Sequence, residues 1–132
     1  MDFAPLHIRS GYSFLKSGLT MERLFQACKK ANYSSLALTD LGVLFGYPTF
    51  VKLANENHMH YGLGIEIQVS LPQHSSAHQD FLEKPFPLCL YAMDEEGYHS
   101  LMRISSYLSY HDSILYDHPD ILGEHLVAIL AT

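Results

Sequence analysis

Short apolar runs of strand length alternate with segments of helical periodicity, and this alternation limits the possible folds more than any other feature of the chain. Near-continuous apolar runs suit strands that are buried on both faces of a sheet. The runs that predict strands are 35–39 (SLALT), 62–70 (GLGIEIQVS), 86–92 (FPLCLYA) and 126–130, preceded by a short extended stretch at 5–9.

Helices are predicted between these strands. Thr20 is a good N-cap for a helix over about 20–31, and similar patterns predict helices at 47–57 and, capped by Asp94, up to about 109. The apolar face expected for this last helix comprises Tyr98, Leu101, Met102, Ser105 and Leu108. Segment 110–124 is predicted to be a loop or short helix, and 72–85 an exposed polar loop. Strands separated by helices predict an α/β fold with parallel βα units.

Composition excludes several classes of protein. With 132 residues and 48% apolar content, the chain is long enough for one domain with a sizeable core. The net charge of −6 argues against a basic groove for nucleic acid. Two cysteines without a CxxC motif fit a reducing compartment, and neither a secretory signal nor a membrane span is recognisable, so we expect a cytoplasmic protein.

A few polar residues on or beside the predicted strands are candidates for chemistry. His7 and Arg9 face the same side of an extended segment, but a guanidinium cannot coordinate a cation, so His7 is either a metal ligand or structural. Asp40, at a strand end, is either a cap or a site acid. Glu66 lies in an otherwise apolar strand and needs a partner. The other histidines lack the spacing typical of zinc sites.

Four segments together, LHIRSGYSFLKSGLTMERL, SLALTDLGVLFGYPTFVKLA, GLGIEIQV and FPLCLYAMDEEGYHSLMRISS, resemble a known family in order and spacing. They are similar to the N-terminal polymerase-and-histidinol-phosphatase (PHP) domain of bacterial DNA polymerase III alpha subunits of the DnaE type. The resemblance implies a distorted (βα)7 barrel with metal ions at the C-terminal ends of its strands. It implies that His7, Asp40 and Glu66 occupy metal-ligand positions of the family.

The sequence departs from the family pattern at four other ligand positions. Arg9 replaces the second histidine of the HxH motif, and Lys16 replaces an aspartate. Leu41 and Pro87 stand where the family has histidines. We therefore expect a degenerate site without zinc or manganese, in which His7, Asp40 and Glu66 are vestigial and positive charge at ligand positions replaces the metal. A partial single-metal site using His7 and Glu66 is the alternative.

The resemblance also implies a role. We expect a structural, non-catalytic segment of a replicative polymerase, which as a whole would use magnesium for DNA synthesis. Its partners would be the rest of the polymerase chain and other replisome subunits, with no direct DNA binding by this segment. The alternative is an active metal-dependent phosphoesterase, either a 3′–5′ exonuclease or a small-molecule phosphatase.

The whole chain, 1–132, is expected to form one partial PHP domain, about the first half of a barrel, judged against roughly 250 residues for a complete (βα)8 barrel. The predicted strand at 126–130 lies close to the end of the sequence, which suggests a segment of something larger. An incomplete barrel leaves a strand edge unpaired, so we expect a homodimer or a strand-exchanged assembly of the chain.

Overall fold

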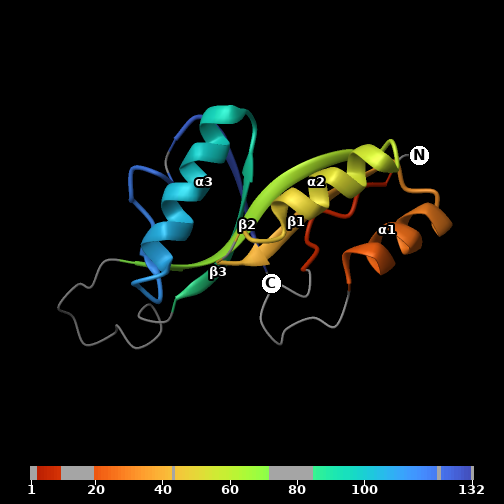
Figure 1. The fold of residues 1–132 in the computed structure, drawn as a ribbon. Helices are drawn as coiled ribbons and strands as arrows, with labels where there is room; N and C mark the ends of the chain where they lie inside the picture. Colours follow the sequence, from red (N-terminus) through yellow and green to blue (C-terminus); the bar gives the residue numbers. More distant parts are fainter. Residues whose placement is uncertain (1–2, 10–19, 43, 72–84, 122, 132) are drawn as a thin grey trace. The chain divides into compact units, whose positions relative to one another are not determined.

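The computed structural model describes residues 3–9, 20–42, 44–71, 85–121 and 123–131. These residues belong to two compact units, Met1–Ile65 and Glu66–Thr132. The strand order is β1-β2-β3-β5, and β4 pairs with β2 (Figure 1). The boundary between the units falls within β2 (His60–Ser70), so this strand contributes residues to each of them.

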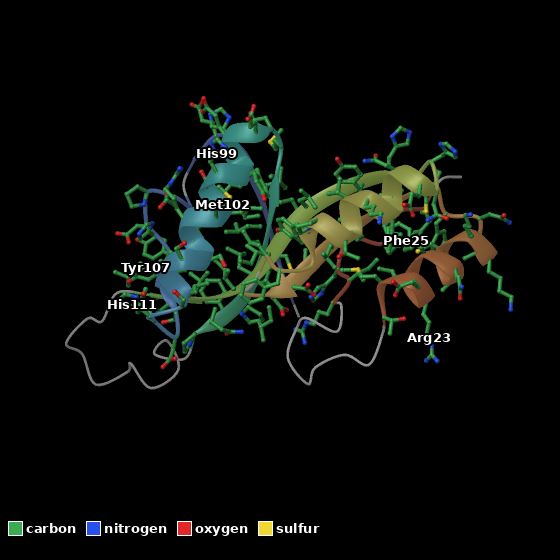
Figure 2. All side chains as sticks on the ribbon, viewed as in Figure 1. Arg23, Phe25, His99, Met102, Tyr107 and His111 are labelled. Atoms are coloured by element: carbon green, nitrogen blue, oxygen red, sulfur yellow. The ribbon has the colours of Figure 1, made fainter. Side chains whose placement is uncertain are left out.

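The first unit contains α1 (Met21–Lys30), β1 (Ser35–Leu41), α2 (Tyr47–Glu56) and the start of β2, which confirms the predicted order. Helix α1 begins where predicted, because the Thr20 hydroxyl accepts a hydrogen bond from the Arg23 backbone N–H at 3.3 Å. The two helices pack through aromatic rings, with the Phe25 and Phe50 centroids 5.5 Å apart (Figure 2 labels Phe25). Both rings are buried, so this contact lies in the core of the unit.

Both helices of the first unit end with a residue in the left-handed region. Asn32 (φ 60°) follows α1 and His58 (φ 55°) follows α2. After α2, the Met59 N–H donates to the Ala54 carbonyl at 2.9 Å, and the His58 N–H donates to Asn55 at 3.2 Å. This is the hydrogen-bond pattern of a Schellman motif, in which glycine or asparagine is the usual left-handed residue.

The predicted first strand, residues 5–9, forms only a single bridge in the structure. Ile8 pairs in parallel with Leu38 of β1, and the Thr39 N–H donates to the Ile8 carbonyl at 2.8 Å. The N-terminal segment therefore runs beside β1 without forming a full strand.

The second unit contains the end of β2, β3 (Phe86–Ala92), α3 (Glu95–Leu108), β4 (Ile114–Leu115) and β5 (Leu126–Leu130). The predicted bounds of β3 and β5 are confirmed. Segment 110–124, predicted as a loop or short helix, contains the short strand β4. The predicted loop at 72–85 lies, except for its last residue, outside the described residues.

The sheet is mixed, so the prediction of parallel strands throughout is wrong. Strand β4 pairs in parallel with β2, with Val69 opposite Ile114. Strand β5 pairs antiparallel with β3, with Cys89 opposite Ile129. A continuous apolar run predicts a buried strand but contains no information on its direction, because that depends on where the connecting segment delivers the chain.

Helix α3 buries a face one position away from the predicted one. The buried residues are Gly97, Ser100, Leu101 and Ile104. Met102, predicted to point inward, is 41% exposed (Figure 2). The small residues Gly97 and Ser100 lie on the buried face of α3. A prediction based only on the positions of apolar residues does not include them.

The residue before β5, His125, contacts the N-terminus of α3 through hydrogen bonds and ion pairs. Asp94 caps the helix by accepting from the Gly97 N–H at 2.9 Å, and its other oxygen lies 2.6 Å from His125 Nδ1. His125 Nε2 lies 2.8 Å from a Glu96 carboxylate oxygen. Only a protonated imidazole donates from both ring nitrogens, and these contacts raise the pKa of His125. Gly97 is required here, because a Cβ would lie 2.3 Å from the His125 carbonyl oxygen.

We expect His58→Gly to stabilise the chain by about 0.5–1 kcal/mol, because glycine adopts the left-handed conformation without a Cβ penalty. Urea unfolding of the variant and the parent sequence measures the difference. His60→Gly is the matched control, since His60 lies in extended β2, where glycine should destabilise. A loss of stability at position 58 as large as at position 60 would contradict the assignment of a left-handed cap.

We expect His125→Ala to lower the melting temperature in a pH-dependent way. The hydrogen bonds from the Gly97 backbone and from His125 lower the pKa of Asp94, while the hydrogen bond to Asp94 raises that of His125. The stabilisation is therefore complete between pH 3.8 and 6.5, the ordinary pKa values of the two groups. It is lost as pH rises through the raised pKa of His125, or falls through the lowered pKa of Asp94. His99→Ala, on the exposed face of α3, is the control, and an effect of His125→Ala that is equal at every pH would exclude the charged pair.

Candidate functional site

The first unit places three of the expected site residues on two adjacent chain segments. His7 and Arg9 flank Ile8, which pairs with Leu38, and Asp40 follows two residues later in β1. His7 is exposed, Arg9 is half-buried, and Asp40 is 0% exposed. The unit therefore brings the first two motifs of the predicted site onto neighbouring segments.

Asp40 belongs to the strand itself and does not cap a helix. It lies inside β1, whereas α2 begins seven residues later, at Tyr47, and its N-cap is Gly46 without a side-chain capping bond. The preceding Thr39 is also 0% exposed, so the carboxyl group lies in a fully buried stretch of strand. A buried carboxylate is costly without a cation or hydrogen-bond donors. The two interpretations of Asp40, a site acid and a loop cap, both stay predictions.

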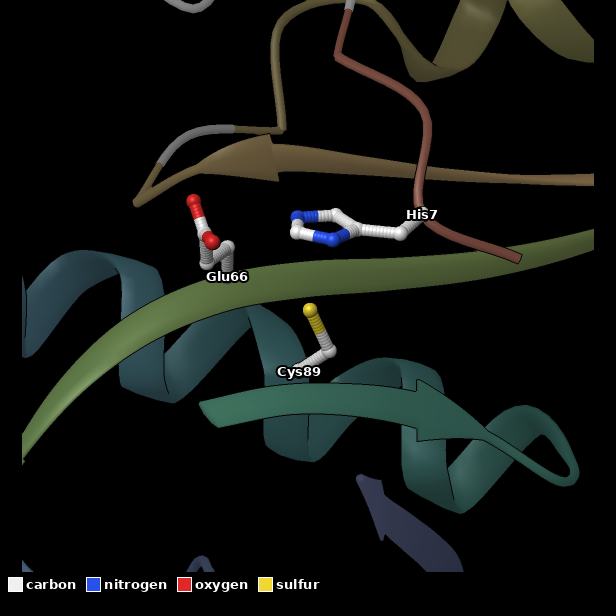
Figure 3. A group of neighbouring side chains, drawn as sticks. All are labelled: His7, Glu66 and Cys89. Carbon is white, nitrogen blue, oxygen red and sulfur yellow. The ribbon is translucent and has the colours of Figure 1, made fainter. Parts of the chain in front are cut away.

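In the second unit, Glu66 and Cys89 come together from neighbouring strands. Glu66 lies on β2 and Cys89 on β3, and each is 2% exposed. A carboxylate oxygen of Glu66 and the Sγ of Cys89 lie within 4.8 Å of each other, and Figure 3 shows the two side chains. The sequence prediction that Glu66 needs a partner is consistent with this buried position.

Tyr91, which is half-buried, lies beside Glu66 and Cys89. Burial is the main cause that raises its pKa, followed by the charge of Cys89, a hydrogen bond with Cys89 and the charge of Glu66. Because Cys89 and Tyr91 are two residues apart on β3, their side chains share one face of the sheet. The hydroxyl of Tyr91 therefore stays protonated more firmly than that of an exposed tyrosine.

Sequence reasoning missed Cys89 as part of this group. The two-residue repeat of a strand could have identified it, because every second side chain lies on the same face of the sheet. Pro87, Cys89 and Tyr91 are spaced in this way. The resemblance aligns Pro87 with a histidine ligand of the family, and the Cys89 thiol lies two residues further along that face. A free cysteine in an apolar run is more often a small buried hydrophobe, which is why the pattern alone did not single it out.

Three positions that the resemblance aligns with family ligands carry no metal-binding side chain. These are Arg9, Leu41 and Pro87, and a guanidinium such as that of Arg9 stays protonated. In the described part of the second unit, Glu66 and Cys89 bring one carboxylate and one thiol close together, whereas tight zinc sites use three or four protein ligands. Lys16 lies outside the described residues, so its expected place at the site stays a prediction.

Comparisons with known proteins agree with the resemblance. The chain is 35% identical over 115 residues to the DNA polymerase III subunit alpha of Borreliella burgdorferi, covering 86% of this chain. It is 33% identical over 108 residues to that of Bacillus subtilis, covering 82%. The matches span 10% and 9% of those two proteins, so the chain corresponds to about a tenth of their length. Among the described residues, no helix is both long and apolar enough to cross a membrane.

A solved structure shares the fold. A protein from Bifidobacterium adolescentis, described as a candidate metal-dependent phosphoesterase, superposes with a TM-score of 0.57 at 17% identity. The match covers 82% of this chain and 32% of that one. The sequence also matches the family described as PHP domain over residues 5–131, nearly its full length. With the order of strands and helices, these matches show that the chain belongs to the PHP domain family.

Proposed function

We propose that the chain is a structural, non-catalytic PHP segment of a bacterial replicative polymerase alpha subunit. The observation that carries this proposal is Arg9, whose guanidinium stands at a family ligand position on the segment beside β1, next to the strand with the buried Asp40. A site that has exchanged a ligand for a fixed cation has lost the means to hold that metal ion.

The same exchange explains how the acids are tolerated. In a metal site, the ions neutralise the carboxylates. Arg9 supplies positive charge within the first unit, beside the strand that contains the buried Asp40, and Lys16 is expected to do so as well. The net gain in stability is small, because buried ion pairs often only offset the cost of their own desolvation.

The proposed role concerns the whole polymerase rather than catalysis by this chain. The whole alpha subunit would extend DNA with magnesium, and this segment would contact the rest of that chain and other replisome subunits. The net charge of −6 supports a role apart from DNA binding, since a DNA-binding face requires clustered lysine and arginine. We also propose that the described strands form part of a distorted (βα)7 barrel, with 1–132 as one partial domain.

The second candidate function is a metal-dependent phosphoesterase with a single ion. The observation that favours it is the buried pair of Glu66 and Cys89, because carboxylate oxygen and thiolate sulfur are both ligands for zinc. His7, which matches the first ligand position of the family, would supply a third donor. One ion with open coordination positions activates water for phosphate hydrolysis.

We expect Arg9→Gln to destabilise the chain by about 1–3 kcal/mol, because it leaves the buried carboxylate of Asp40 without its cation. Adding Asp40→Asn should recover part of this loss, which a double-mutant cycle in urea unfolding measures. Arg23→Gln is the matched control, since Arg23 is exposed on α1 (Figure 2) and its loss should change stability by less than about 0.5 kcal/mol. Additive effects at positions 9 and 40 would contradict the proposed charge replacement.

We expect the unaltered chain to bind no stoichiometric zinc or manganese, and the double variant R9H/L41H to gain zinc binding. The two histidines restore donors at family ligand positions, and elemental analysis after dialysis measures the bound metal. The matched control is R9Q/L41Q, which removes the same side chains without adding imidazole ligands and should bind no metal.

Metal binding together with phosphatase activity would favour the second candidate function, a single-ion phosphoesterase. Stoichiometric metal in the unaltered chain, with manganese-dependent release of nitrophenol from nitrophenyl phosphate, would contradict the structural role. That activity should then disappear in His7→Ala and in Cys89→Ala, whereas Cys28→Ala, at the buried cysteine of α1, should retain it.

A further inference from the structure

The outer edge of β5 is unprotected within the part of the chain that the structure describes. Strand β5 is the last in the sheet order, with β3 as its neighbour there. Its five residues, LVAIL, contain no charge and no proline, and Val127, Ile129 and Leu130 are 43%, 42% and 59% exposed. Edge strands of natural proteins are normally protected by charges, proline, bulges or a covering segment. This edge therefore has the character of an interface.

The hydrogen bonds to β3 identify which backbone groups point outward. The Met93 N–H donates to the His125 carbonyl at 2.9 Å, and the Ala131 N–H donates to the Pro87 carbonyl at 3.1 Å. The N–H and C=O of one strand residue point to the same edge, and the edge alternates from residue to residue. The odd-numbered residues from 125 to 131 therefore face β3. Leu126, Ala128 and Leu130 direct their backbone groups to the outer edge.

The sequence of this strand is a chemical palindrome. Leucine stands at both ends, the β-branched Val127 and Ile129 lie inside them, and Ala128 is at the centre. The centre of the palindrome is also one of the outward-pointing residues. These two properties are independent, since the first depends on side chains and the second on the register with β3.

We propose that the occupant of this edge is a second copy of the chain, paired β5 to β5 in antiparallel orientation about a twofold axis at Ala128. In this register, Ala128 exchanges backbone hydrogen bonds with the partner's Ala128, and Leu126 does so with the partner's Leu130. A twofold interface requires a self-complementary surface, which a palindromic strand provides.

The side chains fit the same arrangement. Val127 lies opposite the partner's Ile129, in the pair type where side chains approach most closely. Every opposed pair is apolar, so no charge is brought against its like. Val127 also shares a face with Tyr91, its cross-strand neighbour on β3, so the apolar surface continues from each protomer onto the joined strands. The proposal concerns the 132-residue chain by itself, since in a closed barrel a further strand would occupy this edge. It depends on β5 alone and is independent of the state of the metal site.

The test uses Ala128, which in the proposed dimer lies on the twofold axis, opposite the partner's Ala128. Ala128 is exposed, so Ala128→Lys and Ala128→Glu should both fold, while each places two like charges at the axis. By sedimentation equilibrium, we expect the unaltered chain to be dimeric and each variant to dimerise at least about tenfold more weakly. An equimolar mixture of the two variants should form a one-to-one heterodimer, because lysine then lies opposite glutamate. Met102→Lys, an exposed apolar position on α3, is the matched control and should dimerise like the unaltered chain.

Several outcomes would overturn the proposal. A monomer at the highest soluble concentration would assign the edge to another occupant, such as a further strand of a longer chain. Dimerisation of Ala128→Lys as strong as that of the unaltered chain would place the interface elsewhere. A mixture of the two charge variants that stays monomeric, or an assembly larger than a dimer, would exclude the twofold pairing.

Discussion

The buried carboxylates of Asp40 and Glu66 are the constraint on which the rest of the structure depends. Asp40 is 0% exposed in β1 and Glu66 is 2% exposed in β2, among apolar neighbours such as Leu38 and Ile65 that have no charge to offer. A carboxylate in such surroundings requires a cation or several donors, or it becomes protonated. Under the proposed charge replacement, Arg9 would supply a cation beside Asp40, on the segment that pairs with β1.

The second unit is organised by a local contact between the ends of two strands. The His125 carbonyl accepts from the Met93 N–H at the point where β3 ends, and it lies against Gly97 at the start of α3. Because β5 begins where β3 ends, it runs back along β3, which makes the pair antiparallel. The side chain of His125 also forms ion pairs with Asp94 and Glu96, so side-chain contacts join the start of β5 to the start of α3 in addition to the backbone contacts. One cluster at the helix N-terminus thus determines the direction of the last strand.

Short-range sequence patterns predicted most of the helices and strands. The features that they did not predict depend on contacts between residues far apart in the sequence. Thr20 and Asp94 marked the starts of α1 and α3 because capping depends on residues only three apart. The direction of β5 and the short β4 depend on pairing with β3 and β2, which no local period encodes. For the site, a carboxylate in an apolar run identified Glu66 as a candidate, because the physical cost is visible in the sequence itself. Cys89 carries no such signal, since a thiol in a strand is unremarkable until a carboxylate is found beside it.

The proposed exchange of a metal ligand for Arg9 would change how the stability of the fold depends on metal ions and pH. A bound ion stabilises the folded state by an amount that grows with the free ion concentration and is lost when the ion is scarce. Metal ligands must also be deprotonated, so that stabilisation falls as pH falls. A guanidinium is attached to the chain and stays charged across the physiological range, so its charge depends on neither the supply of metal ions nor pH. A domain that hydrolyses phosphate esters cannot accept this exchange, because a guanidinium does not generate a metal-bound hydroxide. Under the proposed structural role the exchange would be acceptable, and the stability of the segment would then not depend on a supply of metal ions.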